Sequence, residues 1–540
     1  MQYRATTMGM NGMVTTPHYL ASQAALKVLQ QGGNAIEAAI AAASTIGVVY
    51  PHMNGIGGDN FWLIYNAHTQ EMKALNASGR AGEQATIDFY KSRGYDQIPA
   101  RGALAANTVP GAVKGWEDAY TYSQEHMNGT QRWAQLLDDA IQYARDGFPV
   151  TPSQQHWTEV NLEPDEHFRA LQRFEEFSTI YLQDGKPPEV GSVFKQEDLA
   201  YTLQRIAEDG AVYFYDELAK QVVEDLAAHG GVLTERDFRE HTSSWVTPLT
   251  VNYRGYDAYN LPPNTQGIAS LSILNILNHI DIASIPEGSA QYYHVLVEAI
   301  KRAFADRDRY VTDPEFVDIP TDELLSAQRG KELAATIEMT PKELQPLDPK
   351  GDTVWFGIVD KDGNAVSFIQ SIYHEFGSGF IPKGTGVLLQ NRGSFFSLDE
   401  AHINALQPKK RTFHTLNPAM LLKDGQPCLV YGTMGGEGQP QTQAALVTRI
   451  IDYGMNVQEA IEAPRWLYGR TWGADSNTVK LESRIAQSVC DKLQQFGHDI
   501  EMMPPLTDVM GHAGAIWIDQ QTAVKYGGTD PRSDGAAVGY

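Results

Sequence analysis

"GDTVWFGIVDKDGNAVSFIQS", residues 351–371, contains the pattern that decides the fold. Apolar side chains alternate along residues 354–359, a polar turn follows at 360–364, and a second apolar run covers 365–369. Alternation on both sides of a short Asp/Gly/Asn turn predicts a β-hairpin. Thr353 opens the first strand, where a β-branched residue is common for packing reasons alone.

Thr353 also has a second interpretation, as a new chain end. If the Asp352–Thr353 bond is cut, Thr353 gains an α-amino group with a pKa of about 8, so part of it is unprotonated at neutral pH. That amine can accept the proton of the Thr353 hydroxyl, and one residue then supplies both nucleophile and base. The polar segment 320–350, with prolines near its edges, predicts a mobile connector before the bond. The residues alone leave both interpretations open.

Length and charge limit the class of protein. A chain of 540 residues predicts two domains or one large composite domain. The formal net charge of -24 argues against nucleic-acid and anionic-membrane partners, because phosphates would be repelled. The sequence contains no run of about 18 apolar residues, so we expect no membrane span. The N-terminus lacks the apolar core of a signal peptide. Two cysteines, Cys428 and Cys490, fit a reducing compartment, so we expect a cytoplasmic protein.

Helical patterns dominate before residue 350 and strands dominate after it. Thr16-Pro17 predicts a helix start with Thr16 as its N-cap. Asn34 is expected to cap a second, Ala-rich helix that should be buried, because its apolar positions surround it. Longer helices are predicted within 261–277 and 292–316. Sheets packed face to face, with helices outside, would account for this order.

Two glycine-rich turns, 55–58 and 432–438, could present backbone N–H groups to an anion. Each taken alone is more often a tight turn, because Gly adopts positive φ freely. Neither is a dinucleotide fingerprint, since the first precedes a strand and Pro440 lies where the second needs a regular helix start. The histidines are scattered without an HExxH motif, so we expect neither a metal nor a cofactor.

Residues 353–371 resemble the start of the small subunit in the γ-glutamyltranspeptidase family of N-terminal nucleophile hydrolases, which cut themselves before a Thr. The segments "GMVTTPHYLASQAALKVLQQGGNAIEAAIAAA" (12–43), "GIGGDNFWLIYN" (55–66) and "DPRSDGAAVGY" (530–540) resemble other parts of the family in the same order. The resemblance therefore covers essentially the whole chain.

The resemblance implies an α+β fold, the four-layer αββα sandwich of this class. A large segment, 1–352, and a small segment, 353–540, would build one composite domain and stay together after cleavage between Asp352 and Thr353. It implies no cofactor and leaves a higher homo-oligomer open.

The resemblance also assigns catalytic roles. Thr353 matches the nucleophile, and Ser371 matches the hydroxyl residue that hydrogen-bonds it, with Ser here where Thr is usual. Gly435 and Gly436 match the pair whose N–H groups form the oxyanion hole. A donor of that kind stabilises the transition state by roughly 3–4 kcal/mol.

The substrate-binding positions depart from the family pattern. Typical members hold a glutamyl α-carboxylate with an Arg and two Ser residues, and the α-amino group with an acidic residue, an Asn and a Gln. The corresponding positions here are Ser78 (with Arg80 two residues on) for the Arg, His414 and Thr415 for the Ser pair, Tyr373 for the Asn, Arg392 for the Gln, and Phe395 for the acidic residue.

These changes favour an acyl group with a carboxylate and no ammonium. Phe395 cannot pair with an ammonium, and leaving such a charge buried and unpaired is costly. The guanidinium of Arg392 suits a carboxylate in two-pronged geometry. The set resembles the acylase-like branch, which includes oxamate amidohydrolase and cephalosporin (glutaryl) acylases. Arg392 and Thr415, with His414 or Arg80, would then hold the carboxylate of a small amide substrate; a structural salt bridge is the alternative for Arg392.

The expected function is thus a self-cleaving amidohydrolase or acyltransferase that works through an acyl-Thr353 intermediate. Two other functions stay open. One is γ-glutamyltranspeptidase or glutathione hydrolase activity. The other is an unprocessed, inactive protein that binds small carboxylates.

Overall fold

The computed structural model describes residues 4–165, 167–338, 352–469 and 476–540. The hairpin predicted within 351–371 is present, as β10 (Asp352–Val359) and β11 (Ala365–Tyr373) pair antiparallel across the 360–364 turn. Both strands are buried from residue 353 onward. They therefore form the centre of a sheet rather than a half-exposed hairpin.

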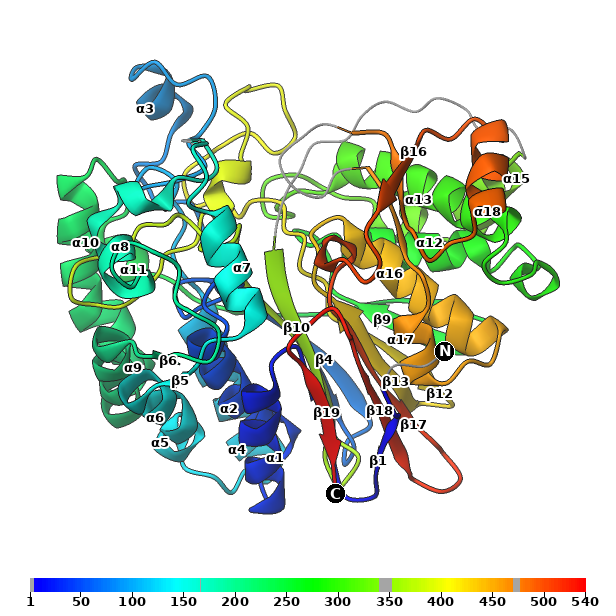
Figure 1. The fold of residues 1–540 in the computed structure, drawn as a ribbon, viewed down its shortest axis with the longest axis horizontal. Coiled ribbons are helices and arrows are strands. Elements are labelled where there is room, and N and C mark those ends of the chain that lie inside the picture. Colours follow the sequence, from blue (N-terminus) through cyan, green and yellow to red (C-terminus); the bar gives the residue numbers. More distant parts are fainter. Residues whose placement is uncertain (1–3, 166, 339–351, 470–475) are drawn as a thin grey trace.

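Two seven-stranded antiparallel sheets form the middle of the molecule (Figure 1). The sheet that contains β10 has, in spatial order, β19 (Ala536–Gly539), β2 (Met13–Thr16), β10, β11, β3 (Asp59–Asn66), β4 (Glu71–Ala77) and β7 (Ser244–Val246). The second sheet has β1 (Thr7–Gly9), β18 (Lys525–Thr529), β17 (Ala513–Ile518), β13 (Gln426–Thr433), β12 (Ala419–Lys423), β9 (Tyr256–Asn260) and β8 (Leu249–Tyr253). Two small sheets comprise β14 (Trp466–Tyr468), β15 (Val479–Glu482) and β16 (Ile500–Met503), and β5 (Phe148–Pro149) with β6 (Val193–Phe194).

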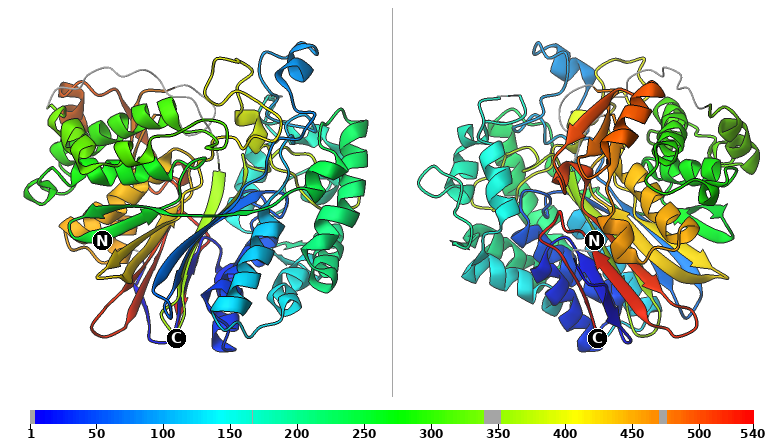
Figure 2. Two further views of the ribbon diagram at one scale, coloured as in Figure 1. Left: turned by 180° about the vertical axis from the view of Figure 1, so that it is seen from behind. Right: turned by 45° about the vertical axis from the view of Figure 1, so that its right-hand side comes forward.

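Helices cover the outer face of each large sheet (Figures 1 and 2). On the side of β10 lie α1 (Tyr19–Gln30), α2 (Ala35–Val49), α4 (Ala112–His126), α5 (Trp133–Leu136), α6 (Asp138–Asp146), α7 (Pro152–Val160), α8 (Glu175–Tyr181), α9 (Glu197–Asp209), α10 (Ala219–Ala228) and α11 (Glu235–Arg239), with α3 (Ile87–Lys91) above them in Figure 1. On the other side lie α12 (Gly267–Leu277), α13 (Ala290–Tyr310), α14 (Thr321–Leu324), α15 (Ala327–Ala335), α16 (Gly438–Val447), α17 (Val457–Glu462) and α18 (Gln487–Gln495). Among the described helices, none has the length and apolar content needed to cross a membrane.

The alternation of side chains along β3 explains the four layers. Phe61 and Leu63 belong to the apolar cluster between the two sheets. Trp62 and Ile64, one residue on, belong to the cluster between the sheet and its helices. Since successive side chains of a strand point to opposite faces, every second residue serves a different core. The expected αββα sandwich is therefore present.

Both large sheets combine strands from the two halves of the chain. β2 pairs with β10, and β11 pairs with β3, so residues before and after 353 share the centre of one sheet. In the other sheet β12 pairs with β9 and β1 pairs with β18, so a run of four strands from the second half lies between strands from the first.

The start of the first helix differs from the prediction. Thr16 ends β2, where it pairs with Ala536, and α1 begins only at Tyr19. His18 is the N-cap, and its Nδ1 accepts a hydrogen bond from the Leu20 N–H at 3.3 Å. Sheet pairing of Thr16 has displaced the start of the helix. The predicted Asn34 cap of α2 is present as a full capping box.

One other local prediction is tested only in part, and a second was wrong. Segment 320–350 contains α14 and α15 in its first half, while residues 339–351 lie outside the described part of the chain. Helix α16 does begin within the second glycine turn, at Gly438, with Pro440 in its first turn. Proline is tolerated there because the first N–H groups of a helix have no helical acceptor.

Candidate active site

Thr353 lies almost fully buried at the start of β10, and Asp352 and Thr353 are consecutive residues of that strand. The pairing of β10 with β11 shifts register here, because Asp352 faces Tyr373 and Val354 faces Gln370. Thr353 is thus opposite both Ser371 and Ile372, which is the geometry of a β-bulge. The bulge brings the predicted partner, Ser371, beside Thr353.

Tyr373 has an unusual backbone at the end of β11. Its φ of 85° lies in the left-handed region, which a bulky residue rarely adopts. The Ser371 Oγ accepts a hydrogen bond from the Tyr373 N–H at 2.8 Å and supports this conformation. Strain of this kind tends to occur at functional sites, where the surroundings hold it in place.

The second glycine turn follows β13. Gly435 and Gly436 both have positive φ, 113° and 52°. Neither N–H donates a hydrogen bond within the described residues. At the end of β13, a Cβ on Gly432 would lie 2.3 Å from the Trp355 Nε1, so the turn starts against the residue two positions after Thr353. Two N–H donors without acceptors among the described residues therefore lie in a turn that begins where β13 packs against Trp355 of β10.

The first glycine turn, 55–58, plays a different part. A Cβ on Gly58 would lie 2.1 Å from the carbonyl oxygen of Ser371, and one on Gly57 would lie 2.1 Å from that of Leu388. The Gly58 N–H is donated to the Gly55 carbonyl at 3.2 Å. This turn uses glycine for close backbone approach, as expected of a tight turn.

Gln266 links the second glycine turn to the predicted substrate-binding residues. Its Nε2 donates to the carbonyl oxygens of Gly436 and Thr415, both at 2.8 Å. Its Oε1 accepts from the Arg307 Nη1 at 3.0 Å, and the Arg307 Nη2 donates to Glu437 at 2.8 Å. All of these groups are buried. The turn is consequently fixed by buried, charge-assisted contacts.

Arg392 begins a short 3₁₀ helix, Arg392–Phe395, and is only 1% exposed. Its guanidinium carbon lies 3.6 Å from the centroid of the Tyr373 ring and 5.1 Å from that of Phe395. Burial lowers the pKa of Arg392 to about 10, so it is charged at neutral pH. Two aromatic rings thus flank a buried cation, a favourable arrangement for a desolvated guanidinium.

The hydrogen bonds of Arg392 leave one side of the guanidinium open. Nη1 donates to the Thr415 Oγ1 at 3.2 Å. Nε and Nη2 are buried and have no hydrogen-bond partner among the described residues. Arg392 also forms no ion pair with a described residue, so the salt-bridge alternative finds no partner there. Nε and Nη2 point the same way and form the fork that matches a carboxylate.

His414 is turned toward Asp59. Its Nε2 lies 3.3 Å from the Asp59 Oδ2, and its Nδ1 accepts from the Leu416 N–H at 3.4 Å. This pattern assigns the tautomer with the proton on Nε2. Burial lowers the pKa of His414 to about 4, so the ring is neutral at pH 7. His414 therefore lies beside the Arg392–Thr415 pair as a donor to Asp59.

Asp59, at the start of β3, was not indicated by the sequence patterns. It faces Ser371 in the β11–β3 register and is almost fully buried. Its Oδ1 accepts from the Gly79 N–H (2.9 Å), the Gly111 N–H (3.1 Å) and the Gln390 Nε2 (3.0 Å). The available signal was an acidic residue two positions before the apolar run 61–64 of a predicted strand, because Asp is almost never fully buried unless paired.

Among the described residues, no hydrogen bond or ion pair joins the side chains of Ser78 and Arg80 to this group. The Ser78 Oγ donates to the Asn76 Oδ1 at 2.7 Å. The Arg80 Nη2 donates to Glu315 at 2.7 Å, and its Nη1 lies 3.7 Å from Asp313. Both side chains have partners within the protein. Of the predicted substrate-binding residues, the structure brings together Arg392, Thr415 and Tyr373, with His414 next to them.

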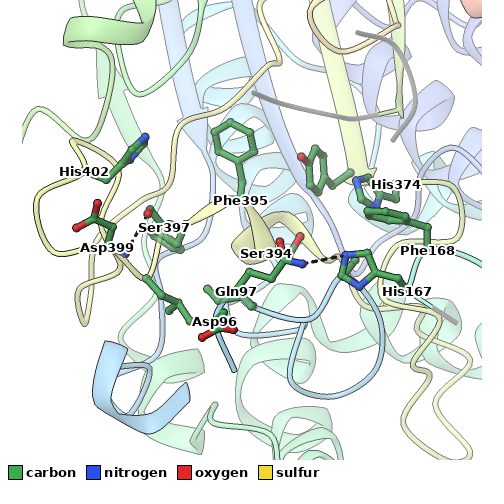
Figure 3. Close-up of a pocket in the computed structure, with 15 residues that line it drawn as sticks. Asp96, Gln97, His167, Phe168, His374, Ser394, Phe395, Ser397, Asp399 and His402 are labelled. Carbon is green, nitrogen blue, oxygen red and sulfur yellow. Dashed lines mark hydrogen bonds between the residues drawn. The ribbon is translucent and has the colours of Figure 1, made fainter. Parts of the chain in front are cut away.

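A cavity of about 320 Å³ is lined by Tyr373 and Phe395, the two residues whose rings flank Arg392 (Figure 3). His374 and Phe168 form one wall near Tyr373, and His374 stacks on the Tyr373 ring at 4.3 Å. The remaining lining is mixed: polar side chains come from Asp96, Gln97, His167, Ser394, Ser397, Asp399 and His402, and apolar ones from Ile98, Ala100, Phe396 and Leu398. The cavity shares its inner wall with the rings that flank Arg392, so it opens beside the candidate site.

One group among the described residues could offer three metal ligands: His294, Glu298 and His498. The two imidazoles are hydrogen-bonded to each other at 2.8 Å. Glu298 is ion-paired with Lys301 (2.8 Å) and Arg302 (2.7 Å). Two cations on the only carboxylate repel a divalent ion, so this cluster fits a closed hydrogen-bonded group better than a metal site.

Comparison with known proteins gives matches along the whole chain. A family model described as Gamma-glutamyltranspeptidase matches residues 21–540. The oxamate amidohydrolase proenzyme of Klebsiella pneumoniae is 47% identical over 539 residues, covering 99% of this chain and 100% of that protein. The glutathione hydrolase-like YwrD proenzyme of Bacillus subtilis is 47% identical over 537 residues, covering 99% of each. The crystal structure of cephalosporin acylase from Bacillus halodurans matches with a TM-score of 0.91 and 37% identity, covering 100% of this chain and 98% of that chain.

Proposed function

The chain belongs to the γ-glutamyltranspeptidase family, and we propose that it is a self-cleaving amidohydrolase for amides of small acyl groups that carry a carboxylate. Cleavage of the Asp352–Thr353 bond would yield segments 1–352 and 353–540. Thr353, as the new N-terminus, would be the nucleophile. The strand pairings between the two segments, present in both large sheets, support a lasting association between them.

The open fork of Arg392 is the observation that carries the substrate class. A buried guanidinium with two unpartnered N–H groups is costly in the empty site, because desolvation is not compensated. A substrate carboxylate would accept both N–H groups in bidentate geometry. Phe395 and Tyr373 flank the cation with rings and offer no acceptor of the kind that an α-ammonium group needs.

The proposed reaction has two steps. The Thr353 Oγ attacks the amide carbonyl carbon while its proton passes to the Thr353 α-amine, and the N–H groups of Gly435 and Gly436 donate to the oxyanion. The C–N bond then breaks, and the leaving amine takes the proton. Water next attacks the acyl-Thr353 ester, which releases the acid and restores the hydroxyl. Ser371, opposite Thr353 at the bulge, would orient the Oγ.

The names of the relatives support the proposed amidohydrolase activity and also suggest the alternative, γ-glutamyl hydrolysis. One relative is called an oxamate amidohydrolase and one matching structure a cephalosporin acylase. Another relative, equally similar, is called glutathione hydrolase-like. A γ-glutamyl substrate would bring an α-ammonium group to the rings of Tyr373 and Phe395, which lack a carboxylate. We therefore place γ-glutamyl hydrolysis second.

Intact mass spectrometry and an amide panel test the proposal together. The purified protein should give two masses that match 1–352 and 353–540. Thr353→Ala should give one uncut chain without turnover, while Thr353→Ser should still be cut and active. The panel comprises oxamate, glutaryl anilide and γ-glutamyl anilide; a preference for γ-glutamyl anilide would replace the proposed substrate class. A fully active preparation with the mass of the undivided chain would overturn the role of Thr353.

A further inference from the structure

We propose that Asp59 is a positioning residue that makes the site selective for acyl carboxylates, by fixing both chain segments that form the Arg392 fork. The inference rests on the function proposed above. Asp59 need not touch the substrate. Its role would be to hold the residues next to Arg392 and Thr415 at one common point.

The first arm of Asp59 reaches the segment that carries Arg392. The Oδ1 accepts from the Gln390 Nε2 at 3.0 Å, two residues before Arg392. The same oxygen accepts the N–H groups of Gly79 and Gly111, at 2.9 and 3.1 Å. Three donors on one buried oxygen fix the carboxylate plane, and the plane in turn fixes Gln390.

The second arm reaches the segment that carries Thr415. The Oδ2 lies 3.3 Å from the Nε2 of His414, the residue immediately before Thr415. Thr415 in turn accepts from the Arg392 Nη1. Both partners of the Arg392–Thr415 contact are therefore held by neighbours bound to one carboxylate. Nη1 of Arg392 is therefore hydrogen-bonded to Thr415, and Nε and Nη2 are held on the same edge of the guanidinium, where they can bind one carboxylate.

Charge supports the same role. Burial lowers the pKa of Arg392, while Tyr373 and then the negative charge of Asp59 act in the opposite direction. Burial lowers the pKa of His414 and Arg392 adds to this, so the imidazole that donates to Asp59 is neutral. Asp59 forms no ion pair with Arg392 among the described residues, so it can order the neighbouring residues and leave the fork available for a substrate.

An amide at position 59 cannot reproduce these contacts. Asn offers one accepting oxygen and one NH₂ donor, whereas both oxygens of Asp59 accept from N–H groups. In either orientation the NH₂ group would oppose a donor: His414 on one side, or Gln390, Gly79 and Gly111 on the other. Since fork geometry must hold within a fraction of an ångström, we expect a selective loss of carboxylate binding.

The test measures Asp59→Asn on substrate pairs that differ only in the carboxylate: glutaryl against valeryl anilide, and oxamate against pyruvamide. We expect KM to rise at least 10-fold for the carboxylate member, with kcat within about 3-fold and kcat/KM for the neutral member unchanged. Mass spectrometry should show the same two segments as in the wild type. An unchanged KM, or an equal loss for both members, would overturn the inference.

His414 supplies a second variant in case Asp59→Asn does not fold. His414→Leu removes the donor to Asp59 and should raise KM for the carboxylate member in the same selective way. His414→Gln can restore an N–H near the Nε2 position and should recover most of that loss. No difference between the two variants would count against the inference. Failure of the wild type on every carboxylate amide would instead overturn the proposed function.

Discussion

Two buried arginine groups in this molecule differ in how their charges are balanced. Arg465 donates to Asp530 at 2.5 Å, and Arg532 donates to Asp530 at 3.0 Å and to Glu482 at 2.7 Å. All four side chains are almost fully buried. Burial raises the pKa of Asp530, but Arg465 and Arg532 together bring it well below its usual range.

Arg392 is equally buried but has aromatic rings and one hydroxyl where the other arginines have carboxylates. In the group formed by Arg465, Arg532, Asp530 and Glu482, each arginine has a carboxylate partner, so the role of this paired group is structural. The guanidinium of Arg392 is left incomplete, and a missing carboxylate is the group that would complete it. On the proposed function, the contrast separates arginines that contribute to stability from one that binds substrate.

The largest effect should come from breaking the paired group. Asp530→Asn leaves Arg465 and Arg532 buried with one carboxylate fewer, and we expect the free energy of unfolding to fall by about 3–5 kcal/mol. Denaturant unfolding measures the loss. Because the pKa of Asp530 is lowered by folding, its contribution is present above about pH 4 and is lost as the pH falls further. The difference between variant and wild type should shrink there; a variant within 1 kcal/mol of the wild type at pH 7 would contradict the comparison.

Removing the unpaired arginine should do the reverse. Arg392→Met deletes a buried charge that has no carboxylate partner, so stability should be equal to or above that of the wild type. KM for carboxylate amides should rise about 100-fold, which corresponds to roughly 3 kcal/mol for two charge-assisted hydrogen bonds. Arg392→Lys serves as the matched control, since it keeps the charge without the fork. A large loss of stability in Arg392→Met would show that the residue is structural.

A small carboxylate ligand should complete the Arg392 group without any mutation. Glutarate or oxalate at 100 times its dissociation constant should stabilise the folded protein by about 2.7 kcal/mol. A thermal shift measured with and without the ligand, at constant ionic strength, reports this effect. Arg392→Met should show no shift. An equal shift in both proteins would mean that the anion binds elsewhere.

The smallest effect should follow from Arg80, which is partly exposed. Its Nη2 pairs with the largely exposed Glu315 at 2.7 Å, and its Nη1 lies 3.7 Å from the buried Asp313; ion pairs at an exposed partner contribute about 0–1 kcal/mol. Arg80→Gln should therefore change stability by less than about 1 kcal/mol and leave KM for carboxylate amides within about 3-fold. Steady-state kinetics on the same amide pairs measure this. A rise as large as that in Arg392→Met would make Arg80 a substrate ligand after all.

Much of the fold could be predicted from local patterns. The alternation around the 360–364 turn predicts β10 and β11, and the Asn34 cap predicts the start of α2. Errors arose where partners distant in sequence decide the outcome. Thr16 looks like a helix cap, but pairing with Ala536 near the other end of the chain keeps it in a strand. Local propensity cannot include such a partner.

The sequence could predict which kinds of residue form the candidate site, but not which contacts these residues make. The residues at positions 392 and 395 indicated a partner for a carboxylate and none for an ammonium group. Which arginine lacks a carboxylate depends on side chains far away in sequence: Glu315 for Arg80, and none of the described residues for Arg392. The sequence patterns did not indicate Asp59 for the same reason: its two oxygens accept hydrogen bonds from donors in four separate segments of the chain.

The mixed origin of the strands has a consequence for the order of events in the life of the chain. Thr353 faces Ser371 of β11, and β11 pairs with β3 (Asp59–Asn66), while β2 (Met13–Thr16) joins β10 to β19 (Ala536–Gly539) in the same sheet. This sheet is complete only when residues 13–16 and 536–539 have met. If the proposed cleavage needs the complete sheet, maturation would act as a proofreading step, since a misassembled copy would not acquire the amine of Thr353.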